Sequence, residues 1–514
     1  MTDQNSLTVE AFEASPLSTL HGIYKDSVLN LRPAPEVATG EVMLASLMRN
    51  VGYVDSGSPI EGKVPVAGRD LEKRIRASNN SPPAAGQLMT GAEWERVLTG
   101  MVASPRQKRE TKRRNLSISP LVPDASLYSL SARLVSNTWN PGNLVRAIVG
   151  IGSNSLEEAD NTWGVLYQAL SVEEDDDVLA KILENEFSFW RPSGSTGGEL
   201  EWKRRRLGED NQVGLEIARG APAKQFCQDV VTLLPLKKRL TLRQWTSMLG
   251  SLVRLAAASH VFWVCHLNHS VWQLVRKTLV ASAAVPSRAE VSNALSECPT
   301  FFKYGEKVQE PIKRAVREFI TGRVALNLIL CVLGEAVGER ELSSKLGRLD
   351  VDQVHGLLKL VAEQREVIDG SALESRVAEL LERNPKTLQC RHGVTNNVVE
   401  FLTYSISRRQ TADDKDINYD QGYWIRKAAS HDNAPWLFIA GPVALLTSAY
   451  CCTAASHTPK TILDLVVHAE KYGVGLRASG AFDGRLIASL RTLGLILDSP
   501  DAEGGMMIKP PFKH

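Results

Sequence analysis

Residues 482–508, FDGRLIASLRTLGLILDSPDAEGGMMI, hold the most informative order of elements in this chain of 514 residues. The first part predicts a helix, because its apolar side chains recur at helical spacing: Phe482, Leu486, Leu490 and Leu493. Gly494 follows, where a helix end favours a residue that tolerates positive φ. The remainder predicts two strands, 495–497 and 506–508, joined by a Gly-rich loop.

The overall composition is typical of a globular protein, with 43% hydrophobic and 23% charged residues. The length suffices for about three or four domains at the usual domain size. The 60 basic and 58 acidic residues give a formal charge of only +2. Any affinity for nucleic acid must therefore come from local clusters.

The cysteines favour a reducing compartment. All seven are scattered, mostly in apolar runs, and none forms a Cys-x-x-Cys pair. The N-terminal residues lack the basic and apolar regions of a secretory signal. The uncharged stretch 434–456 approaches the length of a membrane span, but its proline, glycine and hydroxyl residues favour a buried helix. We therefore expect a cytoplasmic protein with no membrane partner.

The periodicity predicts a mainly α, multi-domain protein. We expect a poorly organised region with a basic linker at 1–115, a helical domain at 116–300, a second helical domain at 301–433 and a C-terminal module at 434–514. The candidate helices are 41–50, 92–102, 125–136, 143–149, 161–170, 176–186, 311–337, 340–346, 351–364 and 374–383, with a further helix through Trp245 and an apolar core segment at 261–272.

The C-terminal order of elements resembles the winged-helix (wHTH) superfamily from residue 442 onward. It consists of helices at 442–455, 461–471 and 482–493 and then the two-stranded ribbon. The resemblance implies that the third helix enters the major groove of DNA and that the ribbon, or wing, contacts the flanking backbone. The region 325–370 has a similar order if 367–370 is a strand, so we consider a second such module there, with a helical-bundle scaffold as the alternative.

The candidate DNA-binding residues form three groups. The first follows Trp202, the second precedes a long helix, and the third belongs to the C-terminal module. They are Arg204, Arg205 and Arg206; Lys237, Lys238 and Arg239; and Lys460, Arg485, Ser489, Arg491 and Lys509. A further basic run, 106–114, is either an arm against phosphates or a solvated linker.

Residues 416–427, DINYDQGYWIRK, combine acids, aromatic rings and bases. Such residues build either an active-site loop or a packing joint between domains, and we favour the joint, because Tyr and Trp bury their rings while keeping their polar tips wet. His266 and His269 lie three residues apart beside Cys265. Without a nearby carboxylate they favour a core pair over a metal site.

Motifs for enzyme chemistry are absent from the sequence, including phosphate-binding loops, His-Glu-x-x-His and Gly-x-Ser-x-Gly. We therefore expect no catalytic residue, metal or cofactor. The expected function is a non-catalytic subunit that binds or positions double-stranded DNA, with little sequence preference, alongside other protein subunits of a bacterial nucleic-acid-processing or phage-defence (antiviral) complex. Two alternatives stay open: a protein–protein adaptor that uses its winged helix, and an unrecognised nuclease or nucleic-acid-modifying enzyme.

Overall fold

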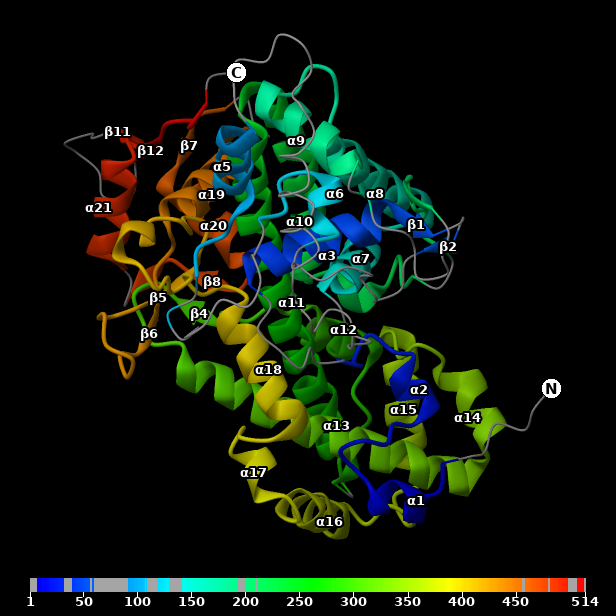
Figure 1. Ribbon diagram of the computed structural model, residues 1–514. Helices are drawn as coiled ribbons and strands as arrows, with labels where there is room; N and C mark the ends of the chain where they lie inside the picture. The colour runs from blue at the N-terminus through cyan, green and yellow to red at the C-terminus, as the bar shows by residue number, and fades with distance from the viewer. Residues whose placement is uncertain are drawn as a thin grey trace.

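The computed structural model describes residues 7–31, 39–55, 58–59, 91–106, 108, 119–128, 141–189, 191, 199–208, 211–280, 282–454, 458–478, 481–497 and 506–512. Within these ranges the protein is mainly α-helical, as the periodicity predicts, and its short strands form small sheets (Figure 1).

In chain order, the described part of the first half contains α1 (Val9–Ala14), α2 (Gly22–Lys25), α3 (Gly40–Gly52), β1 (Tyr53–Asp55), β2 (Ser58–Pro59), α5 (Gly91–Val102), α6 (Pro123–Ser126), α7 (Pro141–Gly152), α8 (Leu156–Leu170), α9 (Val178–Phe189), β3 (Leu200–Trp202), the 3-10 helix η1 (Glu216–Ala218), α10 (Pro222–Leu233), the 3-10 helix η2 (Leu234–Arg239) and α11 (Leu242–Leu279).

The described part of the second half contains α12 (Arg288–Ser296), β4 (Phe302–Lys303), α13 (Gln309–Val337), α14 (Glu339–Leu346), α15 (Val351–Glu363), α16 (Gly370–Glu382), α17 (Pro385–Leu388), α18 (Gly393–Tyr404), the 3-10 helix η3 (Asp414–Asp416), β5 (Ile425–Lys427), β6 (Trp436–Phe438), α19 (Pro442–Ala454), β7 (Lys460–Thr461), α20 (Ile462–Glu470), β8 (Val474–Gly475), β9 (Arg477–Ala478), β10 (Ala481–Phe482), α21 (Gly484–Thr492), β11 (Ile496–Leu497) and β12 (Met507–Ile508).

Helix α11 joins two segments that the sequence analysis treated separately, the helix through Trp245 and the apolar stretch 261–272. A capping box starts it, in which Thr241 and Gln244 satisfy each other's backbone amides. From Ser251 to Cys265 every residue is buried. Helices α3, α10, α13, α15 and α19 pack around it, so it lies at the centre of the protein (Figure 1).

One hydrophobic cluster runs from Val9 to Ile508 and draws on all four predicted domain segments. The domain boundaries themselves stay a prediction. Helices α11 and α13 are long and apolar enough to cross a membrane, but both are mostly buried inside the protein, as core helices are. Helix α19, within the uncharged stretch 434–456, has 13 residues, fewer than the roughly 20 that a span needs.

Most predicted helices are present in the structure within a few residues of their expected bounds, including α3, α5, α8, α13 and α15. The predicted helix 125–136 is seen only as α6, and 129–140 lies outside the described residues.

The strand predicted at 367–370 is wrong. The amides of Val367 and Ile368 both donate to the Gln364 carbonyl in a turn, and Asp369 then caps α16. The second winged-helix module near 325–370 depended on that strand.

The C-terminal part forms an antiparallel sheet in the order β11–β12–β7, with α20 starting directly after β7. Asp483 caps the N-terminus of α21, and Gly494 follows this helix with a φ of 67°. Leu486 and Leu490 are buried while Arg485 and Arg491 are exposed, which confirms the predicted orientation of this helix.

A buried polar joint fastens this part to the body of the protein. Asp229 on α10 accepts hydrogen bonds from Gln225 Nε2 at 2.7 Å and from the Tyr472 hydroxyl at 2.7 Å. His468 Nε2 on α20 lies 2.9 Å from Asp229 Oδ2. Because a buried carboxylate needs several partners, these contacts fix α20 against α10.

Substitutions at two glycines can test how the long helices α11 and α13 pack together. A Cβ at Gly322 on α13 would lie 2.6 Å from the Asn268 carbonyl oxygen of α11, whereas a Cβ at Gly250 on α11 would meet nothing within 4 Å. Gly322→Ala should therefore lower the free energy of unfolding by about 1–3 kcal/mol. Gly250→Ala should raise it by about 0.5–1 kcal/mol, because alanine favours a helix interior. Urea unfolding followed by circular dichroism measures both, and equal shifts would contradict this packing.

Candidate functional site

A cavity of about 650 Å³ lies beside the N-terminal half of α11. Its walls come mainly from four parts of the chain: the N-terminus of α3, one face of α11, the segment 404–422 and the β5–β6 hairpin. Lys108, residues 119–121, Gln309 and Val443 complete them. Exposed residues such as Ser247 and Asn433 belong to the wall, so the cavity opens to solvent. Its size suits a small-molecule or cofactor site.

Helix α11 presents a polar stripe to the cavity. The stripe recurs at helical spacing: Arg243, Thr246, Ser247, Gly250, Ser251 and Arg254. The rest of the helix is mostly apolar and buried, so the wall uses the one face on which α11 is not covered by core side chains.

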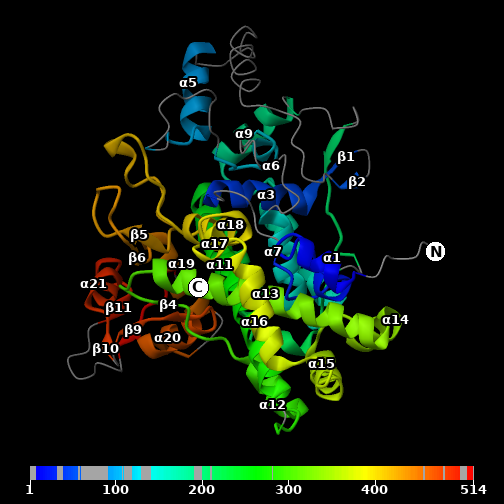
Figure 2. The same ribbon diagram turned by 90° about the horizontal axis from the view of Figure 1, so that it is seen from below.

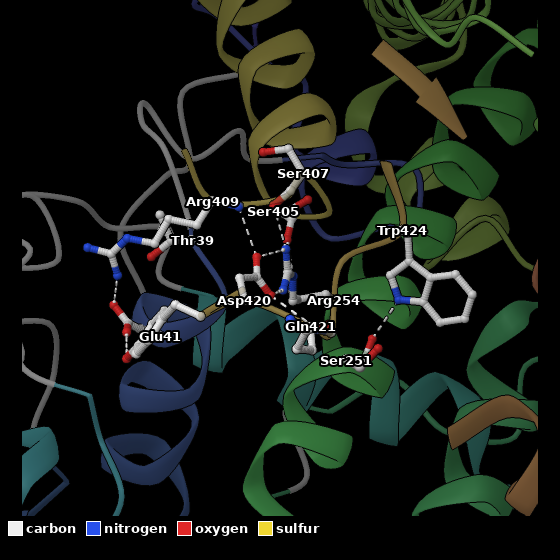
Figure 3. A network of polar contacts seen from close by, with 12 residues as sticks. Thr39, Glu41, Ser251, Arg254, Ser405, Ser407, Arg409, Asp420, Gln421 and Trp424 are labelled. Carbon is white, nitrogen blue, oxygen red and sulfur yellow. Dashed lines mark hydrogen bonds and ion pairs between the residues drawn. The ribbon is translucent and has the colours of Figure 1, made fainter. Parts of the chain in front are cut away.

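Arg254 and Asp420 form the central ion pair of this wall (Figure 3). Arg254 Nη1 donates to Asp420 Oδ1 at 2.9 Å, and the side chains are only 5% and 14% exposed. Arg254 also donates to the carbonyls of Ser405 at 2.7 Å and Ser407 at 2.6 Å. Asp420 accepts from the backbone amides of Arg409 at 3.0 Å and Gly422 at 3.2 Å. The pair thus fixes both ends of the segment 405–422 to α11.

Glu41, in the first turn of α3, anchors the neighbouring wall. It accepts hydrogen bonds from the Tyr419 hydroxyl at 2.6 Å, from Ser104 Oγ at 2.8 Å and from Arg409 Nη1. Burial, and then the nearby Glu41 carboxylate, raise the pKa of Tyr419 well above its usual value. Tyr419 therefore stays protonated and acts as a structural donor.

The lining carries more positive than negative charge. Six basic side chains and three carboxylates line the cavity. Two of the carboxylates are bound by Arg254 and Arg409, and the third, Asp432, lies within ion-pair distance of Lys108 and Lys427. Arg243 and Arg408 form no ion pair with any residue that the structure describes, and each lies over a tyrosine ring, that of Tyr419 and Tyr423 respectively.

The mixed cluster 416–427 packs against the core at one residue and lines the cavity at others. Trp424 packs into the core and donates from Nε1 to the Ser251 carbonyl at 2.9 Å, as a packing joint requires. Tyr419, Asp420 and Lys427 line the cavity. Of the basic run 106–114, Lys108 lines the cavity too, while 107 and 109–114 lie outside the described residues.

The first two groups of candidate DNA-binding residues lie beyond β3 and in η2. Arg204 pairs with Asp160 at 2.6 Å, Arg205 is half-buried and Arg206 is exposed beyond β3. In η2, Lys237 is buried and pairs with Asp176 at 3.0 Å, Lys238 pairs with Asp175 at 3.2 Å, and Arg239 is exposed. Several of these charges are thus already paired within the protein.

The third group lies together on α21 and the sheet beside it, at one edge of the molecule in both views and far from β1 and β2 (Figures 1 and 2). Arg485 pairs with Asp483 at 2.8 Å, and Lys460 lies 3.6 Å from Asp464. Ser489 is half-buried, while Arg491 and Lys509 are exposed. These DNA contacts stay a prediction.

Metal ligation and thiol chemistry find little support among the described residues. No group of three or more His, Cys, Asp or Glu side chains there is arranged to hold a metal ion. His266 is half-buried, and burial lowers its pKa. All seven cysteines are free, and burial raises the pKa of Cys452 to about 11 and that of Cys227 to about 12, so these thiols stay protonated.

A second polar cluster, which the sequence analysis missed, surrounds the fully buried Asp124. Tyr53 donates to its carboxylate at 2.5 Å and Arg191 at 2.9 Å. Burial, and then the Asp124 charge, raise the pKa of Glu184 to about 7. The partners come from positions scattered between 53 and 191, so no local spacing could have indicated them.

Comparisons with protein-family models, with curated proteins and with solved structures give no match for this chain. The function therefore has to be inferred from its own residues.

The buried ion pair of the cavity wall should matter far more for stability than an exposed one on the same helix. Arg254→Ala removes the positive partner of buried Asp420 and the side-chain donor to the Ser405 and Ser407 carbonyls. It should lower the free energy of unfolding by about 3–5 kcal/mol. Arg276 pairs with Glu374 at 2.7 Å, but both side chains are more than 40% exposed. Arg276→Ala should cost no more than about 1 kcal/mol. Urea unfolding midpoints compare the two, and similar losses would contradict the structural role of Arg254.

The raised pKa of Glu184 predicts a pH-dependent stability. Between its unfolded value of 4.5 and its folded value of about 7, the unfolded state loses a proton that the folded state keeps. Stability contributed by protonated Glu184 is therefore lost as the pH rises through this window. Glu184→Gln should gain stability relative to wild type from pH 4.5 to about 7 and keep a constant advantage above. Thermal melting across this range measures the gain, and a difference between variant and wild type that is the same at every pH would contradict it.

Proposed function

We propose that this protein is a non-catalytic subunit that binds or positions double-stranded DNA through its C-terminal module, residues 434–514. The observation that carries the proposal is the way α21 and the β11–β12 ribbon are held together. β12 pairs with β7, and β7 leads directly into α20. The ribbon is therefore tied beside α21, as a wing beside a recognition helix has to be.

The exposed face of α21 has the character that contact with DNA needs. Arg485, Ala488, Arg491 and Thr492 are exposed, and the helix from 484 to 492 contains no carboxylate. Small and hydroxyl side chains between two arginines allow close approach to a groove and offer contacts to phosphates and base edges. Since Asp483 already pairs with Arg485, we expect modest affinity with little sequence preference.

The position of α21 is also favourable. It lies at the periphery of the molecule in two perpendicular views, with β11 next to it (Figures 1 and 2). Its buried face is made by Leu486 and Leu490, which belong to the common core. A helix fixed to the core on one side and open on the other can be docked into a major groove without rearrangement.

Charge reversal on the exposed face should separate binding from folding. We expect Arg485→Glu with Arg491→Glu to weaken binding of a 20-base-pair duplex strongly, while the melting temperature changes little, as for most exposed substitutions. Leu490→Ala is the converse control. It removes a fully buried side chain and should lower the free energy of unfolding by about 2–5 kcal/mol. Gel shift and thermal melting of each variant are the measurements.

The salt dependence of DNA affinity shows how many basic residues contact phosphates. If the four candidate basic residues of the module, Lys460, Arg485, Arg491 and Lys509, each contact a phosphate, log K should fall with log salt with a slope of about −3.6. Contacts from about two further residues of the other basic groups would make the slope about −5. Unchanged DNA affinity in the double variant, together with loss of a protein partner in a pull-down, would replace the DNA proposal with the adaptor. Absence of binding at low salt would remove the DNA proposal altogether.

A further inference from the structure

We infer that the cavity beside α11 is a nucleotide-binding site, which takes either a free nucleoside phosphate or the phosphorylated end of a single nucleic-acid strand. This site is separate from the exposed face of α21 and does not depend on the function proposed for it.

The excess of basic side chains in the cavity favours an anionic ligand. Arg243 and Arg408 line a space whose carboxylates are bound by other side chains, and neither forms an ion pair with a described residue. Arg408 Nη2 donates only to neutral groups, the Ile417 carbonyl and the Asn418 side chain. Lys427 adds a third cation, which lies over the Trp436 ring and donates to the Asp432 carbonyl at 2.7 Å. Arginine forks are suited to phosphate because they form two parallel charge-assisted hydrogen bonds.

Gly250 shows that space is kept where a side chain would otherwise be favourable. It lies inside the 38-residue helix α11, where glycine is less stable than alanine by about 0.5–1 kcal/mol. A Cβ at this position would meet nothing within 4 Å, so packing does not require the glycine. Glycine instead leaves the middle of the polar stripe open. A glycine that lowers helix stability at a cavity wall is expected where a ligand approaches the backbone.

The remaining lining fits the nucleoside part. Three aromatic side chains line the cavity: Tyr404, whose ring can stack a base, and Tyr419 and Trp436, whose rings already lie beside Arg243 and Lys427. Gln309, Gln421 and Asn433 offer carboxamides that can pair with base or sugar edges. The hydroxyl of Ser251, a residue only 1% exposed, has no hydrogen-bond partner among the described residues. The volume of about 650 Å³ lies within the range of small-molecule sites.

The wall is also pre-organised. Asp420 holds Arg254 and the amides of Arg409 and Gly422, while Glu41 holds Tyr419 and Arg409 (Figure 3). The backbone on both sides of Arg408 is therefore fixed before a ligand arrives, which reduces the entropy lost on binding.

The test uses the full chain and four probes: ATP, inorganic pyrophosphate, a single-stranded DNA 12-mer with a 5′-phosphate, and the same 12-mer with a 5′-hydroxyl. Isothermal titration calorimetry at low salt measures each affinity. We expect saturable binding of ATP or of the 5′-phosphorylated strand. Similar affinities for ATP and for the phosphorylated strand assign the site to free nucleotides. At least tenfold tighter binding of the phosphorylated strand than of ATP and of the 5′-hydroxyl strand assigns it to strand ends.

Four variants locate the binding. Arg243→Ala and Arg408→Ala should each weaken the bound probe about tenfold or more, the usual effect of losing a charge-assisted hydrogen bond. Arg340→Ala, an exposed arginine on α14, is the matched control and should bind as wild type. Gly250→Trp places an indole at the cavity wall, where a Cβ meets nothing within 4 Å, and should abolish binding. Its melting temperature shows whether the variant is folded. The changes at Arg485 and Arg491 should leave nucleotide binding unchanged, which separates this site from the α21 surface.

Three results would overturn the inference. One is the absence of saturable binding by all four probes. Another is wild-type affinity in both Arg243→Ala and Arg408→Ala or in a folded Gly250→Trp. The last is equal affinity for pyrophosphate and ATP, which would leave the aromatic and carboxamide lining without a nucleoside to recognise.

Discussion

The burial of α11 is the constraint on which the rest of the structure depends. From Ser251 to Cys265 this helix is buried around its whole circumference, so it has to be covered on every side. At 1.5 Å per residue its 38 residues extend about 57 Å, which one small domain cannot cover. Elements from distant parts of the chain share the task, namely α3 and α10 before it and α13, α15 and α19 after it. A single core therefore forms from segments that the sequence divides into several domains.

The cavity lies at the N-terminal part of α11, where the surrounding helices no longer cover it completely. Towards its N-terminus α11 changes from an apolar helix to one with a polar stripe, and Arg254 marks the boundary, since it is nearly buried yet charged. A charge at such a depth needs a complete set of partners, which Asp420 and two carbonyls provide. Buried ion pairs contribute little net stability compared with apolar packing, but losing one partner is costly. The role of this pair is thus to fix one conformation of the segment 405–422, and the cavity wall is made from that segment.

Local patterns in the sequence account for the helices but not for their polar contacts. The spacing of Leu486 and Leu490 was sufficient to predict which face of α21 is buried, because an amphipathic helix encodes its own orientation. By contrast, Arg254 and Asp420 are 166 residues apart, and Asp229 and His468 are 239 apart. No spacing rule relates such positions. The strand expected at 367–370 is absent for a similar reason, since a short apolar run becomes a strand only where a partner strand lies beside it.

A run of basic residues in the sequence does not show which of its charges are paired in the structure. Lys237, Lys238 and Arg239 form a dense run in the sequence, yet Lys237 is buried against Asp176 and Lys238 lies beside Asp175. Arg243 follows the same run, and in the structure it lines the cavity instead. Counting basic residues cannot separate these cases, because the acids that neutralise them come from another segment, 175–176.

The cavity and the C-terminal module are joined by a short and continuous path. Val443, at the start of α19, lines the cavity, and its amide donates to the Gln421 carbonyl at 3.1 Å. On the other side, the Gly305 amide donates to Phe438 of the β5–β6 hairpin at 2.8 Å, and Arg485 donates to the Gly305 carbonyl at 3.2 Å.

Contact alone does not couple two sites, because a ligand shifts a conformational equilibrium only when it binds the two conformations with different affinity. A nucleotide in the cavity would stabilise the protein by mass action in every case. It would change DNA binding by α21 only if the hairpin moves, so the hydrogen bond from Arg485 to Gly305 is the point at which one site could affect the other.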